Sequence, residues 1–213
     1  MQGLIGTKIG MTRIFDKDTG EVVPVSIIRV GENVVHQRKT MEKDGYDAVQ
    51  MGYGPVGENR LKMPRAGHFR KLGSTPTRLI REFRLDSVDE ELKPGVRVGV
   101  EAFEGVELVD VTGVSKGRGF TGTIKRYNFQ RGRETHGNTN HRQRGSTGNS
   151  AYPGRVFPGM KMPGRYGARQ VTTRGLKLVA TNSEEGLLMV RGAIPGRNKG
   201  IVLVRKHTAT KKA

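Results

Sequence analysis

Residues 12–30 read TRIFDKDTGEVVPVSIIRV and decide the fold class, because two apolar, β-branched runs flank a polar connection that ends in glycine. The runs at residues 12–15 and 22–30 are typical of β-strands, and residues 16–20 between them are typical of a hairpin turn. Pro24 lies inside the second run, where its missing N–H favours a sheet edge or a bulge. The stretch therefore predicts an antiparallel hairpin.

Similar short runs continue along the chain and are separated by turn residues such as Pro94-Gly95 and Gly105. Their spacing is typical of a β-sandwich or a β-barrel, so we expect a mainly β fold. A short helix is expected at residues 65–72, and the capping box at residues 87–90 leaves room for little more than one turn before Pro94. The remaining strands are expected at residues 34–38, 46–51, 78–85, 96–100, 106–111, 171–181, 186–191 and 200–205.

The positive charge is concentrated in the second half of the chain. The 213 residues include 38 Lys and Arg against 20 Asp and Glu, a net charge of +18. Residues 1–110 are neutral overall, residues 111–175 carry +12 with Glu134 as their one acid, and residues 176–213 carry +6. Such an asymmetry indicates a polyanionic partner. Nucleic acid is favoured over an anionic membrane, because the basic stretch lacks an apolar helical stripe.

Composition excludes several other classes of protein. The absence of cysteine removes disulfide scaffolds, thiolate zinc sites and cysteine nucleophiles. The longest strongly apolar stretch, residues 22–30, is far too short to cross a membrane, and no export signal precedes it. We therefore expect a soluble, cytoplasmic protein with no membrane partner.

The β pattern disappears between Val111 and Val171, where glycine and basic residues dominate. A structureless interval of this length inside a compact domain is expected only when it is functional or disordered. We interpret it as an arm projecting from the β-core. The expected domains are a barrel core at residues 1–112 and 171–213 and a basic extension at residues 113–170.

Three motifs in the arm allow catalytic or cofactor interpretations, and each lacks a requirement. Residues 117–122 match G-x-G-x-x-G, yet no acid follows at the distance a dinucleotide site needs. Glu134, His136 and His141 supply only one carboxylate for a metal site. Ser146 and Ser150 have no nearby acid to orient a histidine. We expect no enzyme activity, cofactor, metal or small-molecule substrate.

Aromatic residues are interleaved with the arm's cations, as binding to irregular RNA requires. Phe120 and Phe129 are equally compatible with local packing, whereas Tyr152 and Tyr166 are the better stacking candidates. The candidate RNA-binding residues are Lys116, Arg118, Lys125, Arg126, Arg131, Arg133, His136, His141, Arg142, Arg144, Tyr152, Arg155, Lys161, Arg165, Tyr166, Arg169 and Arg174.

Several separated motifs resemble one family. They are residues 115–122 (SKGRGFTG), Lys125-Arg126, His136-Gly137, residues 145–148 (GSTG), residues 153–157 (PGRVF), Lys161-Met162, the opening residues 3–12 (GLIGTKIGMT) and residues 192–196 (GAIPG). Their order is similar to that of bacterial large-subunit ribosomal protein three along essentially the whole chain. The resemblance implies a translation-protein-type β-barrel on the outer part of the large subunit, which binds 23S rRNA and neighbouring ribosomal proteins. It also implies a role in early assembly and a loop that extends toward the peptidyl transferase centre.

The chain departs from this family at three positions. Many members carry a methylated glutamine after the Gly-Ser-x-Gly string; Asn149 aligns with it here, which puts that modification in doubt. Met160 replaces a residue that is often basic, and Tyr127 stands where many members have tryptophan. These changes affect local contacts in the loop and leave the implied role unchanged.

Two other classes of function share part of the pattern. A basic architectural DNA-binding protein would carry similar charge, but it usually presents a helix or ribbon to a duplex groove. An RNA-modifying enzyme with a β-barrel accessory domain would need a carboxylate, cysteine or cofactor loop beside the basic region, where Glu134 stands alone.

Overall fold

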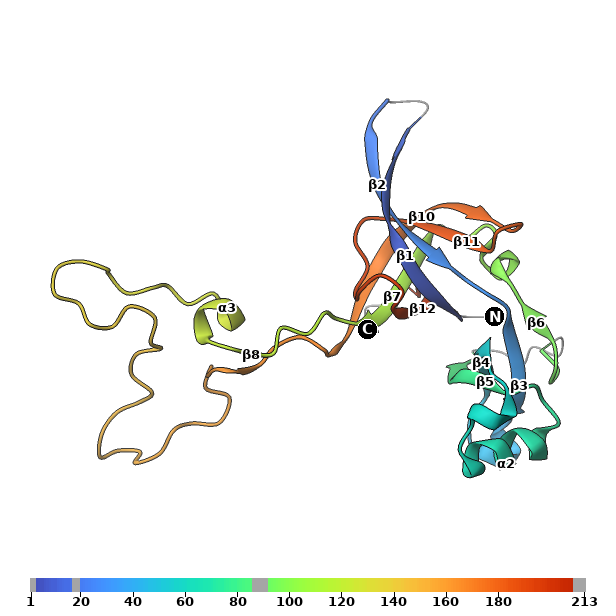
Figure 1. The fold of residues 1–213 in the computed structure, drawn as a ribbon, viewed down its shortest axis with the longest axis horizontal. Coiled ribbons are helices and arrows are strands. Elements are labelled where there is room, and N and C mark those ends of the chain that lie inside the picture. Colours follow the sequence, from blue (N-terminus) through green and yellow to red (C-terminus); the bar gives the residue numbers. More distant parts are fainter. Residues whose placement is uncertain (1–2, 17–19, 86–91, 209–213) are drawn as a thin grey trace. The chain divides into compact units, whose positions relative to one another are not determined.

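The computed structural model describes residues 3–16, 20–85 and 92–208 and divides into two compact units (Figure 1). The first unit comprises residues 1–114 and 170–213, and the second comprises residues 115–169. Each unit has its own set of internal contacts, so each is described by itself. We refer to the second unit as the arm.

The first unit contains a closed barrel of six antiparallel strands in the order β1-β12-β7-β10-β11-β2. This confirms the predicted mainly β fold and identifies the barrel as its form. Within the barrel each strand pairs with a neighbour on both sides. β1 pairs with β12 only over Gly3–Thr7 and extends beyond that pairing against β2. The barrel strands are β1 (Gly3–Phe15), β2 (Val22–Arg29), β7 (Leu108–Val114), β10 (Gln170–Asn182), β11 (Leu187–Arg191) and β12 (Ile201–Lys206).

The predicted hairpin is formed by β1 and β2, which pair antiparallel with Arg13 opposite Pro24. Pro24 lies just past the last pair between β2 and β11, in which Val25 faces Arg191. Its missing N–H therefore costs no ladder bond, because the pairing with β11 has already ended.

Four strands in the part of the chain between β2 and η2 form a separate sheet in the order β5-β4-β3-β6 instead of joining the barrel. The barrel closes without these strands, so the first unit contains a barrel and a second, separate sheet. They are β3 (Asn33–Lys39), β4 (Ala48–Pro55), β5 (Thr77–Arg84) and β6 (Arg97–Val98).

Short helices connect the strands of this sheet: α1 (Met41–Asp44) lies between β3 and β4, and η1 (Glu58–Arg60) and α2 (Met63–Leu72) lie between β4 and β5. A further short helix, η2 (Val100–Phe103), follows β6 and precedes the barrel strand β7. The helix predicted at residues 65–72 is α2, which ends at Gly73 in the left-handed conformation. The capping box at residues 87–90 lies outside the described residues. None of the described helices is long and apolar enough to span a membrane.

One hydrophobic core holds the barrel and the sheet together. Leu4, Ile28 and Val204 from the barrel belong to the same buried cluster as Met51 and Phe83 from the sheet. The close fit leaves no room for a side chain at the start of β1, because a Cβ on Gly3 would lie 2.5 Å from Cε1 of the Phe83 ring. The two β layers are thus one packed body.

Buried His36 on β3 couples the stability of this unit to pH. Its Nε2 lies 2.8 Å from Thr77 Oγ1, and its ring meets Phe69 edge to face. Burial, with a smaller contribution from nearby His68, lowers the pKa of His36 below its usual 6.5. The unfolded chain therefore binds the proton more readily, and this contribution to stability is lost as the pH falls below 6.5.

We expect the free energy of unfolding to fall between pH 7.5 and 5.5, with a contribution from His36 of up to about 1.4 kcal/mol per pH unit. Urea unfolding followed by circular dichroism at the two pH values measures this change. The variant His36→Gln should show a weaker pH dependence than the unchanged chain. Equal pH dependence in both proteins would contradict the assignment to His36.

Candidate nucleic-acid interface

The arm begins with a paired neck, in which its outgoing and returning segments are hydrogen-bonded. Ser115 N donates to Arg169 O at 2.9 Å, and Arg118 N donates to Tyr166 O at 2.9 Å. A two-stranded ladder follows, formed by β8 (Phe120–Thr121) and β9 (Gly164–Arg165). The helix α3 (Thr123–Tyr127) completes the neck, which we define as residues 115–127 and 161–169.

The prediction that the interval contains no secondary structure is therefore wrong in the neck. The residues that pair lie more than 40 positions apart, and each strand is only two residues long. Periodicity along the sequence does not reveal such pairing, because a run of two residues carries no pattern.

Gly167 allows the returning segment to lie directly against the outgoing one. Its φ is +76°, and a Cβ at this position would overlap the Lys116 carbonyl oxygen. Both features require glycine, because other residues rarely adopt this φ and backbone cannot move aside cheaply.

Replacing Gly167 with alanine should loosen the neck by about 1–3 kcal/mol, the cost of holding a non-glycine residue in a disfavoured conformation. Amide hydrogen exchange at Arg118 and Tyr166 measures the loss of protection. Gly122→Ala is the matched control, because Gly122 has an ordinary φ of −70° and open space around it. Unchanged exchange in the Gly167 variant would show that the pairing tolerates a side chain.

Sixteen of the seventeen candidate RNA-binding residues lie in the arm, and Arg174 lies on β10 of the barrel. Fifteen of them are exposed, and only Arg126 and Arg144 are partly buried. Arg126 supports the neck, since its Nη1 donates to Met162 O at 2.8 Å. Arg144 has a buried Nε and Nη1 without a hydrogen-bond partner in the described structure.

The arm has almost no internal compensation for its charge. Residues 115–169 hold twelve Lys and Arg against Glu134, a net charge of +11. Glu134 pairs with Arg131, so the other cations of the arm have no acid within it. Such a surface is stabilised by neutralisation with an external polyanion.

Aromatic rings accompany these cations in two ways. Tyr152 is 87% exposed and Phe120 76% exposed, so both present free ring faces. Tyr166 instead lies under a guanidinium, with the Cζ of Arg118 5.4 Å from its ring centroid. Phe129, which the sequence left open, is partly buried beside Tyr127. The arm therefore offers both stacking surfaces and cation–π pairs.

Hydrogen bonds between its own side chains and backbone hold the distal loop of the arm, which we define as residues 128–160. His141 Nδ1 lies 3.0 Å from Arg133 O, and Asn138 Nδ2 donates to the same oxygen at 3.0 Å. Glu134 is held by Arg131, and among the described residues no three His, Asp, Glu or Cys side chains are grouped to hold a metal ion. Asn149 is exposed and follows a turn in which Ser146 Oγ donates to Gly148 O.

The sequence did not predict that Arg174 lies beside other basic residues on the surface of the barrel. Arg174 lines a hollow of about 460 Å³ with Arg205, Lys206 and His207, and Asp110 Oδ1 holds His207 Nδ1 at 2.8 Å. These side chains meet because β10 and β12 both pair with β7. The only available signal was the +6 charge of residues 176–213, which did not specify a site.

Comparison with known proteins connects this architecture to one family. The family model described as ribosomal protein L3 matches residues 82–213. The large ribosomal subunit protein uL3 of Gloeothece citriformis is 48% identical over 196 residues, which cover 92% of each chain. The proteins of that name from Exiguobacterium sibiricum and Thermotoga petrophila are 50% and 47% identical and cover 96% and 100% of each chain. The match extends from end to end, and the chain belongs to the ribosomal protein L3 family.

Proposed function

We propose that the chain is a structural component of the large ribosomal subunit that binds the large-subunit (23S) rRNA directly, chiefly through the arm. The observation that carries this proposal is the arm's charge of +11, displayed on exposed side chains with one internal ion pair. The curated relatives are named large ribosomal subunit proteins, which supports the same partner. Membership of the family makes the chain a ribosomal protein and not an enzyme.

The mechanism of binding follows from the arm's composition. Phosphates neutralise the self-repulsion of the cations, and Arg guanidinium groups bridge oxygens from neighbouring strands. Glycines let the backbone approach phosphates closely, and exposed rings such as Tyr152 stack on unpaired bases. The paired neck fixes where the loop starts and returns, so fewer residues have to become ordered on binding.

The family supports finer assignments within this proposal. The barrel unit lies on the subunit surface beside neighbouring ribosomal proteins. The basic extension expected at residues 113–170, which contains the arm, penetrates the rRNA toward the peptidyl transferase centre. An arm that crosses several rRNA segments also holds them together, which suits a protein that acts early in subunit assembly. The +11 charge and the exposed aromatic residues are suited to this environment.

The test compares the intact chain with one in which a short Gly-Ser linker replaces residues 120–168. Both ends of the deletion lie inside the arm, because β7 ends at Val114 and β10 begins at Gln170. Binding to large-subunit rRNA and to duplex DNA is measured for both proteins. We expect preference for rRNA and loss of most affinity on deletion. Equal binding of the intact chain to DNA would favour an architectural DNA-binding protein, and full affinity without the arm would place binding on the barrel.

A further inference from the structure

The neutral total of residues 1–110 conceals a second concentration of positive charge. Residues 60–84 hold eight Lys and Arg against one acid, a net charge of +7. The rest of residues 1–110 carries −7, so the two parts cancel in the sum. A folded segment whose exposed charges are almost all positive indicates a surface with a partner of its own.

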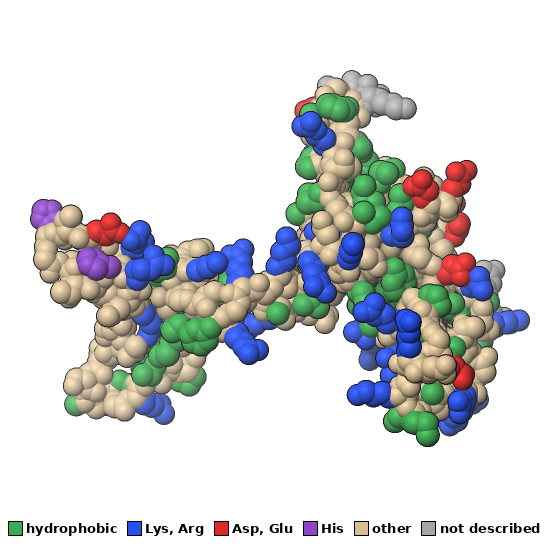
Figure 2. All heavy atoms as spheres, viewed as in Figure 1, with side chains coloured by type: hydrophobic (Ala, Val, Ile, Leu, Met, Phe, Trp, Pro, Cys, Tyr) green, Lys and Arg blue, Asp and Glu red, His purple; other side chains and the backbone are tan. Residues whose placement is uncertain are grey.

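Five of these cations lie on or beside α2. Arg65, Arg70 and Lys71 belong to the helix, Lys62 is its N-cap residue, and Arg60 ends η1 just before it. All five are exposed, and only Arg70 has an ion-pair partner among the described residues, Glu58 at 3.5 Å. In Figure 2, Lys and Arg side chains surround the lobe that carries α2.

The other three, Arg78, Arg81 and Arg84, lie along β5, the edge strand of its sheet. All are exposed, and none has an ion-pair partner in the described part of the chain. Arg65 joins the two groups, because its Nη2 donates to Thr77 O at 3.3 Å and to Arg78 O at 3.1 Å. We call these eight cations on η1, α2 and β5 the basic face.

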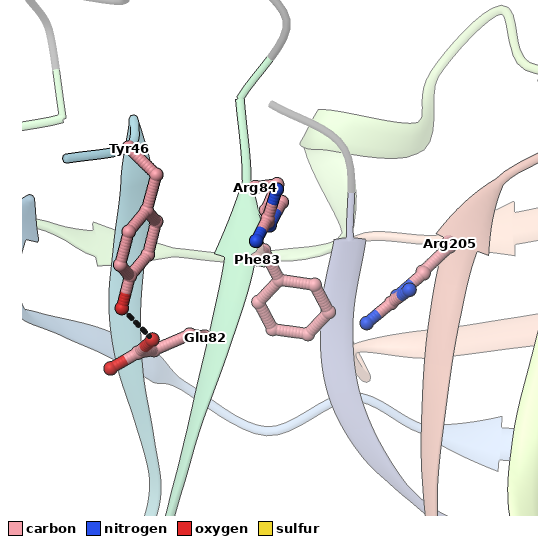
Figure 3. Close-up of a pocket in the computed structure, with 5 residues that line it drawn as sticks. All are labelled: Tyr46, Glu82, Phe83, Arg84 and Arg205. Carbon is pink, nitrogen blue, oxygen red and sulfur yellow. Dashed lines mark hydrogen bonds between the residues drawn. The ribbon is translucent and has the colours of Figure 1, made fainter. Parts of the chain in front are cut away.

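The one acid within this segment, Glu82, is already compensated. It accepts a hydrogen bond from Tyr46 at 2.9 Å (Figure 3). It also accepts one from Gln50 at 3.2 Å and pairs with Lys39 at 3.2 Å. Burial raises the pKa of Glu82, but the hydrogen bonds from Tyr46, Lys39 and Gln50 outweigh it and hold the pKa below its usual value. Glu82 therefore cannot neutralise the arginines beside it on β5.

A pocket of about 330 Å³ lies at one end of the basic face and is lined by Arg84 and Arg205 (Figure 3). Arg205 points toward the Phe83 ring from the neighbouring barrel strand, with its Cζ 5.6 Å from the ring centroid. Arg84 lies 5.3 Å from the Tyr46 ring. Neither guanidinium has an acidic partner among the described residues, so both remain available to a phosphate group.

The basic face differs from the arm in having no exposed aromatic ring. The two aromatic residues of residues 60–84, Phe69 and Phe83, are 1% and 2% exposed and pack in the interior. Without rings to stack on bases, the face contacts the phosphate backbone alone. Phosphate-backbone contact by a folded element suits a regular RNA helix, whose bases are already paired and stacked.

We propose that the basic face is a second RNA-binding surface, separate from the arm, that binds the phosphate backbone of a double-stranded RNA segment. The proposal rests on the proposed function, since the duplex belongs to the same large-subunit rRNA. The two surfaces then bind different parts of the rRNA: the arm contacts irregular RNA, and the basic face binds the barrel unit to an RNA helix.

The absence of cysteine allows a test that locates RNA near single positions. An iron chelate is attached to a single cysteine, introduced as Thr75→Cys between α2 and β5 or as Ser150→Cys on the arm. Glu104→Cys, which lies outside the arm and the basic face, is the control; all three positions are exposed. Each protein is bound to large-subunit rRNA, and hydroxyl-radical cleavage is mapped. We expect cuts from position 75 on both strands of a base-paired segment, different cuts from position 150, and few from position 104.

Other cleavage patterns would contradict either the second surface or the proposed function. Cuts from position 150 without cuts from position 75, or cuts from position 75 only in unpaired RNA, would overturn the second surface and leave the proposed function intact. An absence of specific cuts from either position would count against the proposed function itself.

A charge variant supplies an independent readout on the full chain. Changing Arg60, Lys62, Lys71 and Arg78 to glutamine should reduce the slope of log K against log salt for a 24-base-pair RNA duplex by roughly three to four. The matched control changes Lys43, Lys93, Arg97 and Lys177, which are equally exposed and lie outside the basic face. Equal losses of slope in both variants would show that only net charge matters and would refute a localised surface.

Discussion

Changing six exposed cations of the arm to glutamine should weaken the salt dependence of rRNA binding. The slope of log K against log salt should change from between about −7 and −9 in the unchanged chain to between about −3 and −4 in the variant. The larger slope corresponds to about ten phosphate contacts by the arm, each of which releases a counterion. The six residues are exposed, and no hydrogen bond or ion pair engages their side chains in the described structure: Lys116, Lys125, Arg133, Arg142, Arg165 and Arg169.

The change is large enough to measure by filter binding. Between 50 and 200 mM salt, the unchanged chain should lose roughly 10⁴- to 10⁵-fold in affinity and the variant roughly 10²-fold. The choice of residues keeps the neck intact, because Arg126 and Arg118, which support it through Met162 O and the Tyr166 ring, are left in place. Amide exchange at the neck verifies that the arm is still paired.

The control carries the same loss of six charges at exposed positions of the first unit. It changes Arg13, Lys43, Lys93, Arg97, Lys177 and Arg191, which lie outside both the arm and the basic face. Its slope should stay close to that of the unchanged chain. If the arm variant keeps the full slope, the arm does not carry the electrostatic part of binding.

Local patterns in the sequence predicted the parts of the fold whose partners are close along the chain. The hairpin of β1 and β2 was predicted because both strands and their turn lie within 30 residues. The family resemblance implied a barrel, but local patterns did not reveal how it closes, because β1 pairs with the distant β12, in which Leu4 faces Val204. Strand pairing over such a distance is decided by packing of the whole core and leaves no local signal.

Counting charge by segment revealed the arm but not the basic face, because the result depends on the range of residues over which the charges are summed. A run of cations with one acid is visible in any window, and residues 111–175 are such a run. The charged side chains of residues 60–84 are also mostly cations, but a count over residues 1–110 averages them with the acids in the rest of that range. The neutralisation of Glu82 by Lys39 and Tyr46 was also invisible, since those residues come from β3 and the turn before β4.

Asn33 is a buried polar residue that links the barrel to the four-stranded sheet of the first unit. It is completely buried at the start of β3, and its side chain bonds to the backbone of β1. Its Oδ1 accepts from Ile5 N at 3.0 Å, and its Nδ2 donates to Ile5 O at 3.1 Å and to Gly31 O at 2.9 Å. The amide thus joins the barrel to the four-stranded sheet in place of a missing strand partner.

Replacing Asn33 with alanine should lower the free energy of unfolding by about 3–5 kcal/mol. The loss is large because the buried N–H and C=O of Ile5 and the C=O of Gly31 would remain without partners, and each such group costs about 1–3 kcal/mol. A domain is stable by only about 5–15 kcal/mol, so one side chain accounts for a large share of the total. Urea unfolding followed by far-ultraviolet circular dichroism measures the change, because the chain has no tryptophan to report on it.

Asn198→Ala is the control for this substitution, because Asn198 is an exposed asparagine in the loop before β12. Its effect should stay within about 0.5 kcal/mol, as is usual for a surface substitution. A loss in Asn33→Ala that is no larger than this would mean that water or a shifted backbone replaces the three bonds. The barrel and the sheet would then be joined by apolar packing around Phe83 alone, and the choice of asparagine at position 33 would need another explanation.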